Sequence, residues 1–335
     1  MVKRTFAFIF FLIIGIGLFI SVIVTTGVDS IIESLSQFSL VNFIILVALS
    51  LINFGLFTFR WHVILRQHNK EKKVPFYRLY LHRMTAYAIN YLTPVAYSGG
   101  EPVRIFFLQE EGIDTKSAVS SVIIDKIFEY TALILFIVSG FVVSMIGNDI
   151  FSGKVEIMLT VLILIFGGMI FWFYYATIRK IGFFSSLLRF FRLNKLKFIK
   201  KHEKSIIHVE EHMAYFYIHH VGKFIFLMIL SFATVFFMVI EHWLVARFMG
   251  VHLGFLQSFL SATIPGISYI LPVPGGLGML EGSHAGVFAF LGVSINVFVF
   301  VLILRLRDIV FIFIGLAHAS KQSISMIKKG FRQKN

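Results

Sequence analysis

The chain has 335 residues, of which 58% are hydrophobic and 14% charged, and its mean hydropathy is +0.86. Soluble domains average about 25% charged residues, so this composition excludes a soluble globular protein and indicates an integral membrane protein. The sequence contains no cysteine, which excludes disulfides, thiol nucleophiles and Cys-ligated zinc. The net charge of +14 is distributed as membrane topology requires, so nucleic acid is not expected as a partner.

The apolar runs predict about six membrane-spanning helices. The first run, Phe6 to Val24, is long and lacks a small-x-small cleavage site, so it is predicted as a retained anchor within residues 1–39. Five further runs are longer than the roughly 20 residues that a crossing needs. They are Leu40–Leu65, Thr115–Ile146, Val155–Ile178, Gly222–Met249 and Ser294–Ser320.

The basic residues predict which connections face the cytoplasm. Lys and Arg cluster at the N-terminus, at 60–83, at 179–204 and from Lys321 to the end, whereas the intervening connections contain only Lys154. The positive-inside rule therefore places both termini in the cytoplasm and the intervening connections outside. A multi-pass protein of the plasma membrane is predicted.

Two segments do not fit as simple spans. Residues 76–111 and 255–291 each contain a helix, a Pro/Gly break and a second short helix. The break residues are Pro94, Gly99, Gly100, Pro272, Pro274, Gly275 and Gly276. Charge topology returns each hairpin to its starting side, so both are predicted to be re-entrant, with the breaks facing protein or a water-filled cavity.

The hairpins indicate an inverted repeat, residues 40–146 and 221–320, joined by a linking span at 147–178. At a shift of 180 positions the matches are Pro94 with Pro274, Glu101 with Glu281 and Gly112 with Gly292. At a shift of 179 they are Lys126 with Arg305 and Glu129 with Asp308, and Arg66 matches Arg247 at 181. Chance matching is the alternative. The predicted fold class is an all-α polytopic membrane protein, and broken helices in two halves predict a transporter-like site.

The segment 179–220 is basic and partly amphipathic, and residues 321–335 form a basic tail. The segment is predicted to lie along the inner membrane surface, where anionic lipids attract it. A plain cytoplasmic linker is the alternative. His208 and His212 have the H-x-x-E-H spacing of some zinc proteases, but a solvated helix face explains them better, and neither a metal nor a cofactor is predicted.

Ionisable groups inside a membrane cost at least a few kcal/mol, so they are candidate functional residues. The candidates are Glu101, Arg104, Asp125, Lys126, Glu129, Glu241, Glu281, His284, Arg305 and Asp308. Cationic groups among them are expected to hold a lipid phosphate, while carboxylates balance them or carry protons. The alternative is neutralisation within one helix, because residues three or four apart share a face.

Glu101, the carboxylate at the first break, has a second interpretation as part of a helix cap. Ser98 and Glu101 have capping-box spacing, but Pro102 favours Glu101 itself as the helix cap. Gly99 and Gly100 allow close backbone approach or positive φ. The helix N-terminus behind them favours an anion.

These residues resemble a known family. The segments are Tyr91-Leu-Thr-Pro94, Gly99-Gly100-Glu101-Pro102-x-Arg104, Asp125-Lys126 and Leu271-Pro272-x-Pro274-Gly275-Gly276-x-Gly278-x-x-Glu281. Together they are similar to the lysylphosphatidylglycerol synthase transmembrane, or flippase-like, family from about Leu40 onward. The resemblance implies a flippase for aminoacylated phosphatidylglycerol. The aminoacyl-transferase domain of the bifunctional members is missing, and Lys126 stands where the family commonly has Arg, which loses a bidentate phosphate fork.

The expected function is therefore lipid translocation, with anionic or aminoacylated phospholipids as partners and a separate lipid-modifying enzyme as a further one. No ATP-binding motif occurs in the sequence, so a gradient would drive transport or it would run downhill. The alternatives are a membrane enzyme or enzyme partner acting on lipid-linked substrates and, more remotely, an interfacial zinc hydrolase.

Overall fold

The computed structural model describes residues 24, 28–36, 38–68, 73–93, 99–147, 153–192, 197–270 and 273–332. Within these ranges the chain forms α-helices and short 3-10 segments, and no strand occurs there. The all-α prediction is confirmed for this part of the chain. The predicted anchor at Phe6–Val24 lies outside the described residues except for Val24.

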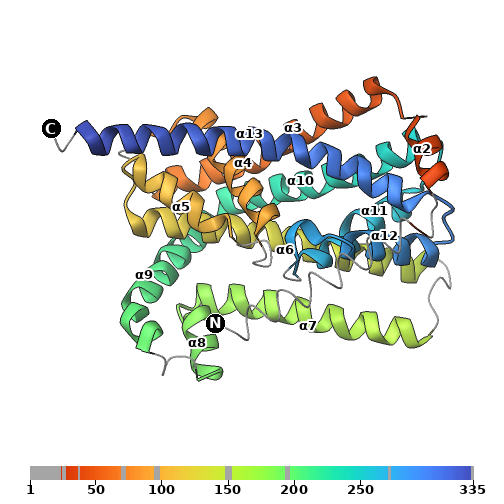
Figure 1. Ribbon diagram of the computed structural model, residues 1–335. Helices are drawn as coiled ribbons and strands as arrows, with labels where there is room; N and C mark the ends of the chain where they lie inside the picture. Colours follow the sequence, from red (N-terminus) through yellow and green to blue (C-terminus); the bar gives the residue numbers. More distant parts are fainter. Residues whose placement is uncertain are drawn as a thin grey trace. The chain divides into compact units, whose positions relative to one another are not determined.

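Figure 1 shows the helices in chain order. Their bounds are α2 Val28–Ser36, α3 Leu40–His68, α4 Phe76–Leu92, α5 Glu101–Glu110, α6 Thr115–Gly147, α7 Gly153–Ile178, α8 Phe183–Phe190, α9 Lys197–His219, α10 Val221–Phe248, α11 Phe255–Thr263, η2 Ile264–Ile270, η3 Pro274–Gly276, α12 Met279–Phe290 and α13 Val297–Arg332.

Five of the long helices coincide with predicted spans: α3, α6, α7, α10 and α13. Among the described residues, Leu40–Gln67 and Val221–Phe248 are long and apolar enough to cross a membrane. Their outward side chains include Ile44, 58% exposed, and Ile229, 63% exposed. Apolar side chains left on a helix surface in this way suit contact with lipid.

The described helices fall into two compact units. The first unit comprises Met1–Thr58, Pro75–Phe107 and Phe236–Asn335, and the second comprises Phe59–Val74 and Leu108–Val235. The boundary cuts through α3, α5 and α10, so each of these helices contributes to both units. The units therefore differ from the two sequence repeats.

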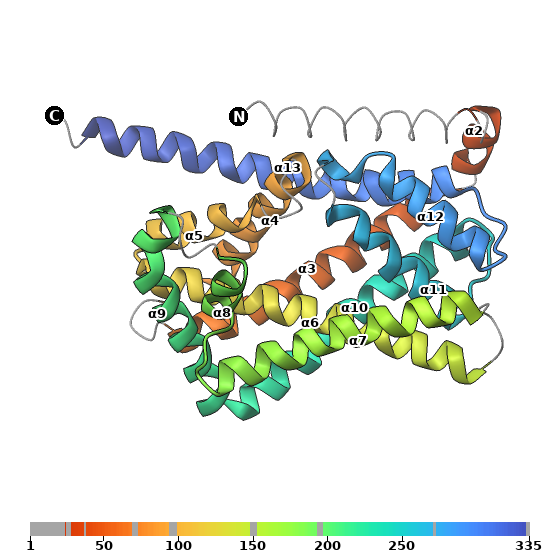
Figure 2. The same cartoon turned by 90° about the horizontal axis from the view of Figure 1, so that it is seen from below.

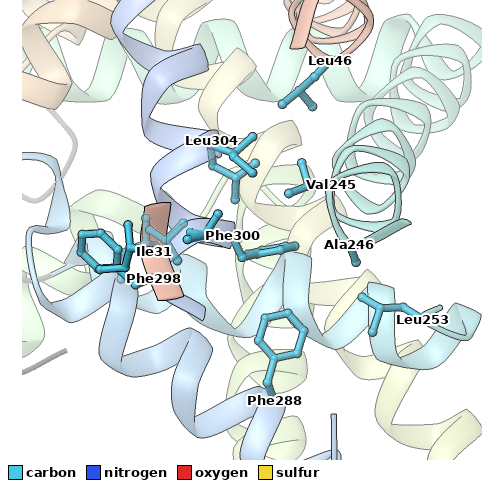
Figure 3. Packing of buried hydrophobic residues seen from close by; sticks show 13 residues of the cluster. Ile31, Leu46, Val245, Ala246, Leu253, Phe288, Phe298, Phe300 and Leu304 are labelled. Carbon is cyan, nitrogen blue, oxygen red and sulfur yellow. The ribbon is translucent and has the colours of Figure 1, made fainter. Parts of the chain in front are cut away.

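In the first unit, α13 packs along α4 (Figure 1). The helices approach closely at Gly315, where an added Cβ would lie 2.4 Å from the Met84 carbonyl oxygen. The Thr85 hydroxyl donates to the Gly315 carbonyl at 2.9 Å. Around α13, α10 and α12, a core contains Val245, Phe288, Phe298, Phe300 and Leu304 (Figure 3).

In the second unit, α7, α8 and α9 lie beside one another (Figure 2). The core there joins Phe128 of α6, Phe173 of α7 and Phe216 of α9. The amphipathic segment predicted at 179–220 thus contains two helices, α8 and α9, whose apolar side chains pack on α6 and α7. This burial gives the segment a defined place in the unit.

The turns that follow α5 and α12 have the same backbone conformation. Gly112 has φ +80° and Gly292 has φ +64°. Ile113 N–H donates to Leu108 O at 2.9 Å, and Val293 N–H donates to Phe288 O, also at 2.9 Å. These six-to-one bonds are Schellman caps, which require a left-handed residue and so favour glycine. The match between Gly112 and Gly292 therefore reflects one turn used twice.

Helix caps also give the register between the repeats. Asp114 caps α6 and Asn296 caps α13, each through a side-chain oxygen that accepts from the backbone three residues later. These caps differ by 182 positions, because the second loop is two residues longer. The sequence-derived shift of 179, which pairs Lys126 with Arg305 and Glu129 with Asp308, differs from this cap spacing by three residues.

Candidate functional site: buried ion pairs at the helix breaks

The second helix break is held by Arg305 of α13. Its guanidinium forms a bidentate pair with Glu281, with Nε to Oε1 at 2.7 Å and Nη2 to Oε2 at 2.9 Å. Nη1 donates to the Tyr91 hydroxyl and to Gly275 O, both at 2.9 Å, and Nη2 donates to Gly276 O at 3.4 Å. A guanidinium has five N–H donors. All five therefore have acceptors here, so Arg305 ties α12, the break and α4 together.

The backbone of this break is available to few residues other than glycine. Gly275, Gly276 and Gly278 have φ of +58°, +59° and +73°. A Cβ on Gly275 would lie 2.5 Å from the Tyr91 ring. Positive φ and close approach both require glycine. The backbone carbonyls at these glycines are the ones that Arg305 binds. Pro272 lies outside the described residues, and Pro274 begins the short η3 turn.

A second ion cluster in the same unit joins α10 to α13. Arg307 donates through Nη1 to Glu241 and through Nε and Nη2 to Asp308 Oδ1, at 3.1 and 2.8 Å. Glu241 and Asp308 are 4% and 1% exposed. Ser50 and Asn53 of α3 lie beside the Glu241 carboxylate. Buried carboxylates of this kind are retained in proteins only with such partners.

Two buried histidines stack next to these clusters. The His242 and His284 rings are 5.7 Å apart with an interplanar angle of 6°. Each Nδ1 lies 2.8–2.9 Å from the carbonyl four residues earlier, Leu280 O for His284 and Met238 O for His242. Nδ1 is therefore the protonated nitrogen in the neutral ring, and Nε2 is the acceptor. His284 Nε2 is buried and has no hydrogen-bond partner within the described residues.

At the first break, the described glycines Gly99 and Gly100 pack closely without positive φ. An added Cβ on Gly100 would lie 2.1 Å from Ala86 O, and the Gly100 N–H donates to Asn90 Oδ1 at 2.6 Å. Arg104 N–H donates to Gly100 O at 3.0 Å. Gly100 is thus the cap of α5, one residue before the Glu101 that the Pro102 rule predicts. Pro94 lies outside the described residues.

The side chains expected at the first break are also placed in α5. Glu101 is the first residue of the helix, and Arg104 lies one turn further and is 2% exposed. Gly99 lies close to the Thr93 side chain. A Cβ added to Gly99 would be 2.3 Å from the Thr93 hydroxyl oxygen. The first unit therefore contains Glu101, Arg104, Glu241, Glu281, His284, Arg305 and Asp308.

The second unit contains the remaining predicted residues, grouped around Arg60. Arg60 Nε donates to Asp125 Oδ1 at 2.8 Å, Nη2 to Glu129 Oε2 at 3.3 Å and Nη1 to Ser231 Oγ at 3.1 Å. Lys126 Nζ donates to Glu129 Oε1 at 3.1 Å. Neutralisation within α6 occurs for Lys126 and Glu129, but Asp125 is neutralised from α3.

Arg60 is a functional candidate that the sequence did not reveal. It lies near the end of an apolar run and was counted among the basic residues facing the cytoplasm, but it is inside α3 and 0% exposed. Arg307 and Tyr91 are further contributors. Arg307 is visible in the sequence as an arginine inside a predicted span.

The two ion clusters occupy equivalent positions with opposite signs. Arg60 lies 21 residues after Ser39, at the start of α3, and Glu241 lies 21 residues after His220, at the start of α10. Asp125 lies 11 residues after the cap Asp114, and Arg307 lies 11 residues after the cap Asn296. The helix pair thus carries Arg with Asp in one repeat and Glu with Arg in the other.

The serines beside these pairs follow the same rule. Ser50 and Ser231 lie 11 residues after Ser39 and His220, respectively. Ser231 of α10 binds Arg60 of α3, and Ser50 of α3 lies beside Glu241 of α10. A serine of α10 thus contacts the charge on α3, and a serine of α3 lies beside the charge on α10.

Side chains of the H-x-x-E-H segment are paired with neighbouring residues. His208 Nδ1 lies 3.0 Å from Glu211 Oε2, and Glu210 accepts from Ser185 N–H at 2.9 Å at the start of α8. His212 lies on α9 in a separate pocket. Among the described residues, no group of three or more His, Asp or Glu side chains is arranged to hold a metal ion.

Long apolar helices, interrupted helix pairs and buried ion pairs define an all-α membrane protein. The chain belongs to the family described as the lysylphosphatidylglycerol synthase TM region, whose model matches residues 9–315. It is also similar to a UPF0104 membrane protein of Methanothermobacter thermautotrophicus, with 24% identity over 293 residues that cover 84% of this chain and 85% of that protein. No solved structure matches the chain. Membership links the protein to lipid handling.

Proposed function

We propose that the protein is a lipid translocator that passes a phosphate-bearing headgroup between the two leaflets of the plasma membrane. The observation that carries this proposal is the buried Glu281–Arg305 pair at a glycine-rich helix break. Charged groups inside a membrane protein are expensive and mark substrate pathways. Irregular backbone at membrane depth lines a cavity or is covered by protein, and a translocation site needs both features.

The geometry of Arg305 suits a phosphate. Guanidinium binds carboxylate and phosphate through the same two-pronged arrangement. Glu281 fills that fork through both oxygens. A lipid phosphate would therefore take the place of Glu281, which would remain as a counter-charge or take up a proton.

Other buried groups in the first unit complete the proposed site. Arg307 supplies a second cation, held by Glu241 and Asp308. His284 Nε2 is an acceptor that suits a headgroup amine or hydroxyl. Arg104, buried one turn inside α5, is the cation proposed for the first hairpin. The sequence contains no ATP-binding motif, so a gradient or the lipid's own imbalance would drive movement.

The test is movement of a fluorescent phosphatidylglycerol in proteoliposomes, read by quenching of the outer-leaflet dye. Single variants Glu281→Gln and Arg305→Gln each leave one buried charge, which costs about 3–5 kcal/mol. The double variant Glu281→Gln/Arg305→Gln removes both charges and is expected to fold. We expect it to move lipid at least about tenfold more slowly than the natural protein.

Arg247→Gln is the matched control, because Arg247 is an exposed arginine of the same unit that lies over the Trp243 ring. Its lipid movement should equal that of the natural protein. Glu101→Gln and Arg104→Ala test the first hairpin in the same assay. A folded double variant with undiminished lipid movement would contradict the assignment of the site to Glu281 and Arg305. A change in lipid mass in the presence of the protein would instead indicate an enzyme.

A further inference from the structure

The second unit contains a pocket of about 540 Å³ that the proposed translocation site does not use. It lies at the C-terminal end of α7 and against α9, with one wall from the end of α3. Its lining residues are Gln67, Lys180, Glu211, His212, Tyr215, Phe216, His219 and His220. The pocket therefore combines one lysine, a carboxamide and three imidazoles with the aromatic side chains of Tyr215 and Phe216.

Lys180 reaches this pocket from a strained backbone. Its φ is +56°. Ile181 N–H donates to Ala176 O at 2.9 Å, which makes Lys180 the left-handed residue of a Schellman cap. Glycine is the usual residue there, since an L side chain at positive φ is strained. From this turn the Lys180 side chain lines the pocket.

Neighbouring side chains fix the other donors. Lys223 Nζ donates to Gln67 Oε1, so the amide oxygen of Gln67 points toward Lys223. His219 stacks on Tyr215 with ring centroids 4.4 Å apart, and its Nδ1 lies 3.1 Å from Tyr215 O. The His219 Nε2 atom is therefore the nitrogen left for another partner, and it donates to a phosphate only when the ring is protonated.

The nearby carboxylates have partners of their own. Glu210 accepts from the Ser185 N–H at 2.9 Å and from its hydroxyl at 2.5 Å, which anchors the start of α8. Glu211, which lines the pocket, lies 3.0 Å from His208 Nδ1. Glu211 is the carboxylate in the pocket lining, and Asp114 lies near His212, so an anion in the pocket would rely on Lys180 for its counter-charge.

We propose that this pocket binds a phosphate group, through Lys180, Gln67 and the imidazoles, with Tyr215 and Phe216 contacting the apolar part of the molecule that carries it. Ammonium and imidazolium groups bind phosphate through charge-assisted hydrogen bonds. The phosphate belongs either to a lipid headgroup or to a water-soluble phosphate compound. This site goes beyond lipid translocation and shares no residue with the Arg305 cluster.

Lys180→Gly separates binding from folding. It removes the ammonium group and relieves the positive φ, so thermal stability should stay equal or rise. Arg192→Gly is the matched control: Arg192 also has φ +56°, carries the same charge and does not line the pocket. Binding is measured by titration calorimetry on the purified full chain, with inorganic phosphate and with dioctanoyl phosphatidic acid as probes.

We expect Lys180→Gly to weaken binding by about tenfold or more, with Arg192→Gly unchanged. Binding of both probes would assign the site to phosphate in general, whereas binding of the lipid alone would assign it to lipid headgroups. Equal binding by the two glycine variants would overturn the proposal, as would a natural protein that binds neither probe. Failure here would leave the Glu281–Arg305 test unaffected, because the two assays use different residues and readouts.

Discussion

Asp114 determines where helix α6 begins. Its Oδ1 accepts the Ser117 N–H at 3.0 Å, and its carbonyl accepts the Ala118 N–H at 3.0 Å. Burial acts to raise the pKa of Asp114, but its hydrogen bonds to Ser117 and Lys116 and the nearby His212 lower it overall. The charged form is therefore the one that the folded protein favours.

This cap gives a pH-dependent contribution to stability. Because the folded pKa is depressed, the contribution is present above the unfolded value of 3.8 and is lost as pH falls through the folded pKa. Asp114→Asn keeps a capping oxygen but does not titrate. We expect the melting-temperature advantage of the natural protein over Asp114→Asn to shrink below about pH 4. A difference that stays constant from pH 7 to pH 3 would show that the carboxylate charge has no part in the cap.

At the scale of elements, glycine has different tasks in the two hairpins. An added Cβ on Gly100 would lie 2.1 Å from Ala86 O, whereas one on Gly282 would meet no atom within 4 Å. The spacing of Gly278, Gly282 and Gly286 predicts close helix packing, but Gly282 and Gly286 face open space among the described residues, and Gly278 serves a turn at φ +73°. Close helix packing at Gly282 and Gly286 is therefore not seen within the described residues.

Alanine variants distinguish these tasks. Gly100→Ala should cost about 1–3 kcal/mol, because the α4 backbone cannot yield to the new methyl group. Gly282→Ala should be neutral or stabilising by up to about 1 kcal/mol, since alanine is the better helix former. Thermal unfolding in detergent measures both. Equal melting temperatures for the two variants would contradict the close contact between α5 and α4.

The charge reversal between repeats makes a second prediction at this scale. Arg60→Glu would place a third carboxylate beside Asp125 and Glu129 and should cost at least about 3–5 kcal/mol. Arg60→Glu/Asp125→Arg reproduces the arrangement that Glu241 and Arg307 already have. We expect the double variant to recover most of the lost melting temperature. No recovery would show that the two helix pairs are not interchangeable in geometry.

For the whole molecule, the absence of cysteine provides a direct test of topology. Lys204→Cys lies on α9, in the segment predicted to be cytoplasmic, and His252→Cys lies in the connection after α10, predicted outside. In intact cells a membrane-impermeant maleimide should label His252→Cys and leave Lys204→Cys unlabelled until the cells are opened. The opposite pattern would invert the predicted orientation, and the natural protein provides the unlabelled background.

Much of the helical framework could be predicted from hydropathy. Leu40 and Thr115 begin α3 and α6 as expected, because a continuous apolar run has a visible edge. Two features could not be predicted from hydropathy. The 3-10 geometry of η2 depends on local packing, and the Arg60–Asp125 pair joins residues 65 apart in the sequence. Pairing over such a distance requires the helix contacts, which periodicity does not contain.

The full occupancy of Arg305 has a kinetic consequence for anything that passes the second break. A phosphate arriving there must exchange with Glu281 or with the break carbonyls, because the five donors are already engaged. Exchange gains little net free energy, so residence would be short and the lipid would be released as readily as it entered. Weak, replaceable binding of this kind is what allows rapid passage. In the proposed translocator, the Glu281 carboxylate would compete with the lipid phosphate for Arg305 and so favour its release.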